Sequence, residues 1–227
     1  MAYLKQEEQK EFIFLTLTAP NVPADELNEE IKHYNHSFKK LMERQEVKKV
    51  VKGYARKLEI TYNEERDDYH PHFHVLIAVD KNYFNNSWSY IKRDRWLELW
   101  QQVTKNSLIT QVDVRKVRNG RNDKVYEIAK YSAKDSEYLI NQDVFEVFYN
   151  ALKGKRLIVF SGLFKDAMTK FKNGELDYYK EKDMTKYVYA IMYNWGDKKY
   201  LELERRYLTD DELEEINGKL IDEKEID

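Results

Sequence analysis

Three histidines alternate with other residues in the stretch His70-Pro71-His72-Phe73-His74, and an apolar run to Val79 follows. A short run rich in valine and isoleucine after a polar segment is typical of a β-strand. Residues two apart project from the same face of a strand, so this alternation would bring the imidazoles together. Convergent imidazoles are ligands for divalent metals. The stretch therefore predicts a metal-bearing active site, with a surface histidine cluster, or His70 capping the preceding loop, as the structural alternative.

A carboxylate from the preceding segment could complete this site. Residues 54–62 alternate between apolar and polar types and predict a strand, and the polar loop 63–68 would turn it into the histidine strand as an antiparallel hairpin. Side chains that face each other across such a pair lie close together, so Glu59 could meet His72 and His74. Two histidines and one carboxylate leave open positions on the ion for a substrate oxygen. His70 is a rival third ligand.

A second group of reactive side chains lies on a predicted helix. Asp123 could cap a helix that extends to about Leu139. At 100° per residue, Glu127, Tyr131 and Lys134 fall within one narrow polar stripe of that helix. An ordinary solvent-exposed face with contacts between residues four apart is the alternative, and spacing alone would favour it. Beside a metal-binding strand, a carboxylate, a phenol and an ammonium grouped on one face favour catalysis.

The remaining pattern predicts an α+β protein. Strands are expected over 12–18, 111–117 and 156–160, and helices over 27–41, from a capping Asp94 through Val103, over 143–153 and over 163–171. A hairpin of 186–194 with 199–207 and an acidic helix over 210–217 would follow. The simplest organisation is a main domain over 1–180, with 181–227 as an extension of the same compact unit.

Composition and charge restrict the class of protein and of substrate. The sequence contains no cysteine, which excludes disulfides and thiolate metal sites and suits a cytoplasmic location. It shows neither a secretory signal nor an apolar run long enough for a membrane span. Residues 202–227 carry eleven acidic and four basic residues, whereas 112–134 carry seven basic and three acidic ones. A basic segment beside the predicted site suits an anionic substrate, although a solvated charged face is the simpler reading.

Several stretches resemble motifs of a known enzyme superfamily. The sequence His72-Phe73-His74 resembles the histidine–hydrophobe–histidine motif of the HUH endonucleases, and Tyr131-Ser132-Ala133-Lys134 resembles their Tyr-x-x-Lys motif. More narrowly, five stretches are similar to the rolling-circle replication initiators, or Rep proteins, of small plasmids from Gram-positive bacteria. They are Thr16-Leu17-Thr18-Ala19-Pro20-Asn21, Leu58-Glu59-Ile60-Thr61-Tyr62-Asn63, His70 to Leu76, Glu127-x-x-Lys130-Tyr131-x-x-Lys134, and Leu152-x-Gly154-Lys155-Arg156.

The resemblance implies a fold and a mechanism. The HUH endonuclease fold is a central antiparallel β-sheet flanked by helices, here with a C-terminal α/β extension. A Mn²⁺ or Mg²⁺ ion on His72, His74 and Glu59 would polarise the scissile phosphate of single-stranded origin DNA. Tyr131 would attack the phosphorus and become joined to the 5′ end. Glu127 would activate water at termination.

The same resemblance assigns supporting residues and partners. Lys134 would balance charge at the phosphate, and a host helicase and polymerase would extend the released 3′ end. A basic set would bind the DNA backbone, namely Arg115, Lys116, Arg118, Arg121 and Lys130.

Two other classes of function remain open on the sequence. The alternating histidines also resemble the histidine triad of nucleotide hydrolases and transferases, in which histidine is the nucleophile and no metal is needed. A non-catalytic DNA-binding module with structural histidines is the second. The histidine triad leaves the grouping of Glu127, Tyr131 and Lys134 unexplained, and the DNA-binding module predicts that Tyr131→Phe leaves all function intact.

Overall fold

The computed structural model describes residues 1–117, 141–179, 189–196 and 199–213. The chain divides into two compact units, Met1–Leu176 and Asp177–Asp227, and each is described by itself.

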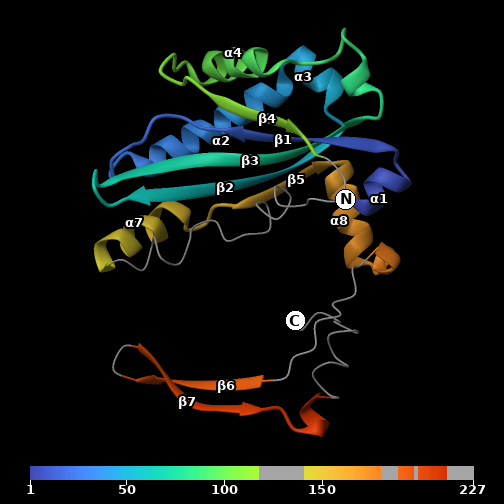
Figure 1. The fold of residues 1–227 in the computed structure, drawn as a ribbon. Coiled ribbons are helices and arrows are strands. Elements are labelled where there is room, and N and C mark those ends of the chain that lie inside the picture. The colour runs from blue at the N-terminus through green and yellow to red at the C-terminus, as the bar shows by residue number, and fades with distance from the viewer. Residues whose placement is uncertain (118–140, 180–188, 197–198, 214–227) are drawn as a thin grey trace. The chain divides into compact units, whose positions relative to one another are not determined.

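A five-stranded antiparallel sheet forms the centre of the first unit, in the order β4-β1-β3-β2-β5 (Figure 1). Its strands are β1 (Lys10–Leu17), β2 (Gly53–Asn63), β3 (Asp68–Asp80), β4 (Val112–Lys116) and β5 (Ile158–Gly162). The histidine-bearing strand β3 is the middle strand, and it forms the expected hairpin with β2. A central strand is hydrogen-bonded on both edges, so side chains on β3 are held in a fixed register.

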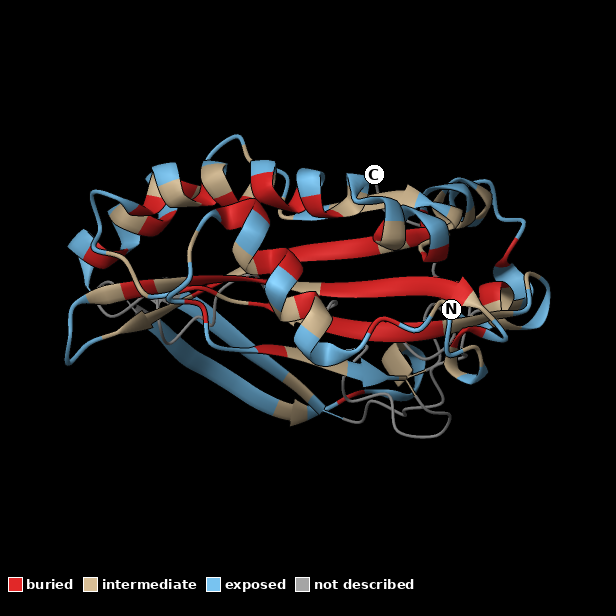
Figure 2. Cartoon of the chain, turned by 90° about the horizontal axis from the view of Figure 1, so that it is seen from above, coloured by how far each residue is buried: buried red, intermediate tan, exposed pale blue. Residues whose placement is uncertain are grey.

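One face of the sheet is covered by helices. The main core joins odd-numbered residues of β3, such as Phe73, Val75 and Ile77, to apolar side chains of four helices. These are α2 (Leu27–Glu43), α3 (Gln45–Val50), α4 (Arg93–Thr104) and α7 (Gln142–Leu152). Figure 2 shows the buried residues along the central strands and on the inward sides of the helices. Helix α2 buries Leu27, Ile31, Tyr34, Phe38 and Leu41, the three- and four-residue spacing that an amphipathic helix requires.

The opposite face of the sheet is covered by apolar groups at one end. Leu76 and Ala78 of β3 pack there with Phe12, Ala55 and residues of two more helices. These are α1 (Ala2–Gln6), which contributes Leu4, and α8 (Leu163–Lys172), which contributes Phe164. Strands β2 and β5 approach so closely there that a Cβ atom at Gly53 would lie 2.6 Å from the Ser161 carbonyl oxygen. Glycine is therefore required where β2 begins.

The second unit contains a two-stranded antiparallel hairpin of β6 (Tyr189–Gly196) and β7 (Lys199–Tyr207). A short 3₁₀ turn, η2 (Asp177–Tyr179), precedes it, and residues 210–213 begin a helical turn. In the first unit, a similar turn, η1 (Tyr83–Asn85), connects β3 towards α4.

The fold class expected from the sequence is confirmed: an α+β protein with a central antiparallel sheet flanked by helices. The role of Asp94 was predicted wrongly, because α4 begins at Arg93 after Lys92, and Asp94 lies in its first turn as an ion-pair partner of Arg93. Helices α1 and α3 were not predicted, since five and six residues are too short to show a period. The predicted helix over 123–139 lies outside the described residues. None of the described helices has the length and apolar content needed to cross a bilayer.

Candidate metal centre

The hairpin register brings the predicted ligands face to face. Glu59 of β2 is paired directly with His72 of β3, and Lys57 with His74. Paired residues share a face of the sheet, and residues two apart on one strand do so too. Glu59, His72 and His74 therefore project from the same face, the one opposite the helix-covered core.

The ligand atoms of these three residues converge. The Glu59 carboxylate lies with Oε1 3.8 Å from His72 Nε2 and with Oε2 3.5 Å from His74 Nε2. One ligand atom from each residue can be chosen so that all three lie within 4.8 Å of one another. Two ligands of a single ion at ~2.2 Å can be at most ~4.4 Å apart, so only small side-chain adjustments would complete the contacts. Two imidazoles and a carboxylate are a donor set that fits a divalent metal.

Backbone and hydroxyl contacts orient both imidazoles. His72 Nδ1 donates to the His70 carbonyl oxygen over 3.2 Å, which leaves Nε2 unprotonated and directed at the carboxylate. His74 Nδ1 lies in a hydrogen bond with Thr16 Oγ1 at 3.2 Å, from the neighbouring strand β1. Hydrogen bonds of this kind select the ring tautomer and hold a metal-binding histidine in place.

Burial keeps His72 neutral. The side chain is almost inaccessible, with 8% of the residue exposed. Burial lowers the pKa of His72, and the neighbouring His74 lowers it further. A metal ligand must be unprotonated, so this environment favours the binding state of the imidazole near neutral pH.

A buried lysine also belongs to the centre. Lys57 has no exposed surface, and its Nζ contacts Glu59 Oε2 at 3.1 Å. A buried ammonium needs a counter-charge, and the carboxylate supplies it. The sequence contained a signal for this residue, because Lys57 stands two positions before Glu59 on the predicted strand. Thr16 stands in one of the stretches similar to Rep proteins, but its contact with His74 depends on the pairing of β1 with β3.

His70 is placed beside the group rather than in it. Its ring lies 5.3 Å from the His72 ring, centroid to centroid, and burial lowers its pKa. Its backbone carbonyl is what contacts His72. This position matches a supporting role better than that of a third ligand.

The residues expected to bind DNA divide between the two faces of β4. Arg115 is paired with Phe14, whose ring contacts His74, so it lies on the face of the candidate metal centre. Lys116 projects to the other face, over the Phe84 ring and near Glu11. The other predicted site residues lie outside the described part of the chain: Arg118, Arg121, Glu127, Lys130, Tyr131 and Lys134.

Fold and site together define an α+β domain whose central strands carry a His₂Glu candidate metal centre. Over residues 1–201 the chain matches the model of a family described as replication protein, and it belongs to that family. It is 63% identical over 142 residues to a "Protein rep" of Staphylococcus aureus, covering 63% of this chain and 62% of that protein.

More distant relatives extend this similarity. A "Protein rep" of Streptococcus pneumoniae is 36% identical over 185 residues, covering 77% of this chain and 58% of that protein. A "Replication protein" of Staphylococcus aureus is 28% identical over 217 residues, covering 87% of this chain and 92% of that protein. The chain thus spans about six tenths of the first two relatives. No solved structure matches the chain. The resemblance to Rep proteins seen in the motifs is confirmed.

Proposed function

We propose that this protein is a plasmid rolling-circle replication initiator that nicks and joins single-stranded origin DNA through a 5′-phosphotyrosine intermediate. The observation that carries the proposal is the convergence of Glu59, His72 and His74 on one sheet face. Membership of the replication protein family supports it. The catalytic portion would lie within residues 1–180, with 181–227 as an extension.

Glu59, His72 and His74 would hold a divalent ion, Mn²⁺ or Mg²⁺. The bound ion would supply Lewis-acid polarisation of a phosphate oxygen. Imidazole ligands suit transition metals better than the strongly oxygen-preferring Mg²⁺, so Mn²⁺ should bind more tightly. Thr16 and the His70 carbonyl would keep the rings oriented.

Tyr131 is the nucleophile in this proposal. Its phenolic oxygen attacks the phosphorus, the bond from phosphorus to the 3′ oxygen breaks, and the leaving oxygen takes a proton to become the 3′-OH primer. A phenol has a pKa of about 10 in water, so it needs nearby positive charge to react at neutral pH. Lys134 would supply that charge and balance the phosphate. Glu127 would accept a proton from water at termination, when hydrolysis replaces a second tyrosine.

The DNA would follow the basic residues near this face. Arg115 lies on this face, and three more basic residues follow it in the sequence: Arg118, Arg121 and Lys130. Lys116 lies on the other face and would contact DNA only beyond the edge of the sheet. The partners would be single-stranded origin DNA, a host helicase and a host polymerase, all in the cytoplasm.

A covalent-adduct assay tests the proposal. Wild-type protein with Mn²⁺ and origin oligonucleotides should give an adduct that survives denaturation in a gel. Tyr131→Phe should abolish it, whereas Tyr126→Phe and Tyr138→Phe serve as matched controls. Glu127→Ala should keep cleavage and lose the hydrolytic step.

Three results would contradict parts of the proposal. An adduct in Tyr131→Phe would move the nucleophile to Tyr126 or Tyr138. Activity that survives chelation would favour histidine-triad chemistry, in which no metal takes part. Unchanged function in Tyr131→Phe, with no adduct in wild type, would favour a non-catalytic DNA-binding module.

A further inference from the structure

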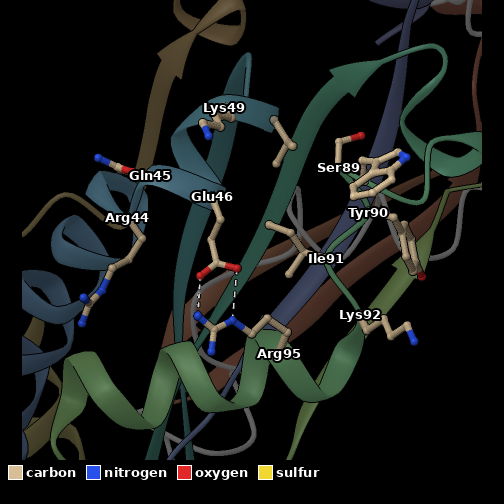
Figure 3. Close-up of a pocket in the computed structure, with 11 residues that line it drawn as sticks. Arg44, Gln45, Glu46, Lys49, Ser89, Tyr90, Ile91, Lys92 and Arg95 are labelled. Atoms are coloured by element: carbon tan, nitrogen blue, oxygen red, sulfur yellow. Dashed lines mark hydrogen bonds and ion pairs between the residues drawn. The ribbon is translucent and has the colours of Figure 1, made fainter.

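A polar groove lies in the helical layer, away from the candidate metal centre. It is a cavity of about 700 Å³ between α3 and the segment that leads into α4 (Figure 3). Both elements pack on the odd-numbered face of β3 through Val47, Ile91 and Trp96. The histidines project from the even-numbered face, so the sheet separates the groove from the metal ligands.

An ion pair between two lining residues joins α3 to α4 across the groove. Arg95 of α4 donates to both carboxylate oxygens of Glu46 of α3, at 2.6 Å and 3.1 Å, as the dashed lines in Figure 3 show. Arg95 also contacts Glu98 at 2.7 Å. This pairing lowers the pKa of Glu46, so the carboxylate remains charged and hydrogen-bonded to Arg95. Among the described residues that line the groove, Glu46 is the only acid, and its charge is paired with Arg95.

Three other cations border the same cavity. They are Arg44, Lys49 and Lys92. Arg44 lies close enough to Glu46 to help lower the pKa of that carboxyl, and no ion pair of Lys49 or Lys92 is found within the described residues. Figure 3 shows Arg44 and Lys49 on the α3 side and Lys92 on the side of α4. The lining thus carries four cations against one acid, and an excess of positive charge remains when the neighbouring Glu98 is counted with that acid. Such a groove attracts an extended anion.

Two exposed aromatic rings line the groove beside these cations. Trp88 has 97% of its surface exposed and Tyr90 has 42%. An indole this exposed contributes nothing to the core, and aromatic platforms of this kind stack on unpaired bases. A positively charged groove with exposed rings is the general form of a single-strand binding surface.

We propose that this groove binds single-stranded DNA, with Trp88 stacked on a base and Arg44, Lys49 and Lys92 in contact with phosphates. The inference rests on the proposed function, because it takes the same class of substrate. The strand in the groove is a different stretch from the one at the metal centre, since the sheet lies between them. The groove therefore adds affinity for DNA that flanks the scissile phosphate and takes no part in the chemistry.

Substitution of the exposed ring tests the stacking contact. Trp88→Ala should weaken binding of a fluorescent 20-nucleotide strand by roughly tenfold in anisotropy titrations. Trp88→Phe should retain most of the affinity, because it keeps an aromatic face. Tyr149→Ala is the matched control, since Tyr149 is 52% exposed, lies on α7 of the same unit and does not line the groove.

Salt dependence tests the phosphate contacts. The double variant Lys49→Gln/Lys92→Gln should lower the steepness of log affinity against log salt by about 1.4. Each lysine that no longer neutralises a phosphate of the single strand lowers it by ~0.7. Arg93→Gln is the matched control, because Arg93 is exposed and already paired with Asp94 at 2.9 Å. Wild-type affinity in Trp88→Ala together with a wild-type slope in the lysine variant would overturn the inference.

The two proposals fail in different ways. Trp88→Ala should bind Mn²⁺ as wild type does and should form the Tyr131 adduct at saturating oligonucleotide. If adducts form but the groove variants bind DNA normally, the groove inference is wrong and the proposed function stands. If the groove variants lose affinity and no adduct forms in wild type, the groove inference stands and the nicking proposal is wrong.

Discussion

The two ends of one sheet face have different tasks although the same strands build both. On β3, Leu76 and Ala78 follow His74 by two and four residues, and they lie on the same face as His72 and His74. The apolar end is covered by Leu4 of α1 and Phe164 of α8. The histidine end instead holds Glu59 and a buried ammonium. One end of this face is therefore expected to serve stability and the other to serve metal binding.

The largest effect should come from the histidine end. His74→Ala should reduce Mn²⁺ affinity by on the order of 100-fold and abolish the adduct, because it removes a ligand from a three-residue set. Isothermal titration with Mn²⁺ and the adduct assay measure this. The unfolding midpoint without metal should change little. Unaltered Mn²⁺ affinity would show that the centre lies elsewhere.

Lys57→Met should be the most destabilising substitution without metal, by about 3 kcal/mol, because it leaves the largely inaccessible Glu59 carboxylate without the Lys57 ammonium. A divalent ion can replace that counter-charge. Mn²⁺ should therefore raise the thermal midpoint of this variant more than that of wild type.

Arg56→Met is the matched control for Lys57→Met. Arg56 is also a buried cation, but it projects to the opposite face, over the rings of Phe38 and Phe73. The Mn²⁺-induced midpoint shift of Arg56→Met should equal that of wild type. Equal shifts in both variants would mean that Lys57 is not coupled to the metal centre.

At the apolar end, Leu76→Ala should cost about 2.5 kcal/mol of unfolding free energy through the cavity it leaves. Urea denaturation measures the loss. Mn²⁺ affinity should remain at the wild-type value, because no ligand is touched. A parallel loss of metal affinity would mean that the two ends of the face are not separable.

The smallest effect should come from His70. His70→Ala keeps the backbone carbonyl that accepts from His72, so Mn²⁺ affinity should fall by less than tenfold, the lower bound for loss of a supporting contact. Titration beside His74→Ala makes the comparison direct. An equal loss in both variants would make His70 the third ligand.

Local patterns in the sequence predicted the elements that build the centre. Strand alternation placed His72 and His74 on one face, and the polar loop 63–68 predicted the hairpin that brings Glu59 opposite. These predictions succeed because alternation and hairpin pairing depend on neighbours in the chain. The motifs also led to the family that the comparisons confirm. Tyr131, Glu127 and Lys134 stay predictions, since they lie outside the described residues.

Tertiary structure decided which of these elements contact one another when they lie far apart in the sequence. The pairing of β1 with β3 brings Thr16 to His74. The pairing of β1 with β4 decides that Arg115, rather than Lys116, lies on the face of the metal centre. The position of α3 beside α4 brings Glu46 to Arg95, and these two residues line the polar groove. By itself the sequence determined which residues could share a strand or helix face. Only the fold decided which faces meet, because strand order and helix packing depend on contacts between residues far apart in the chain.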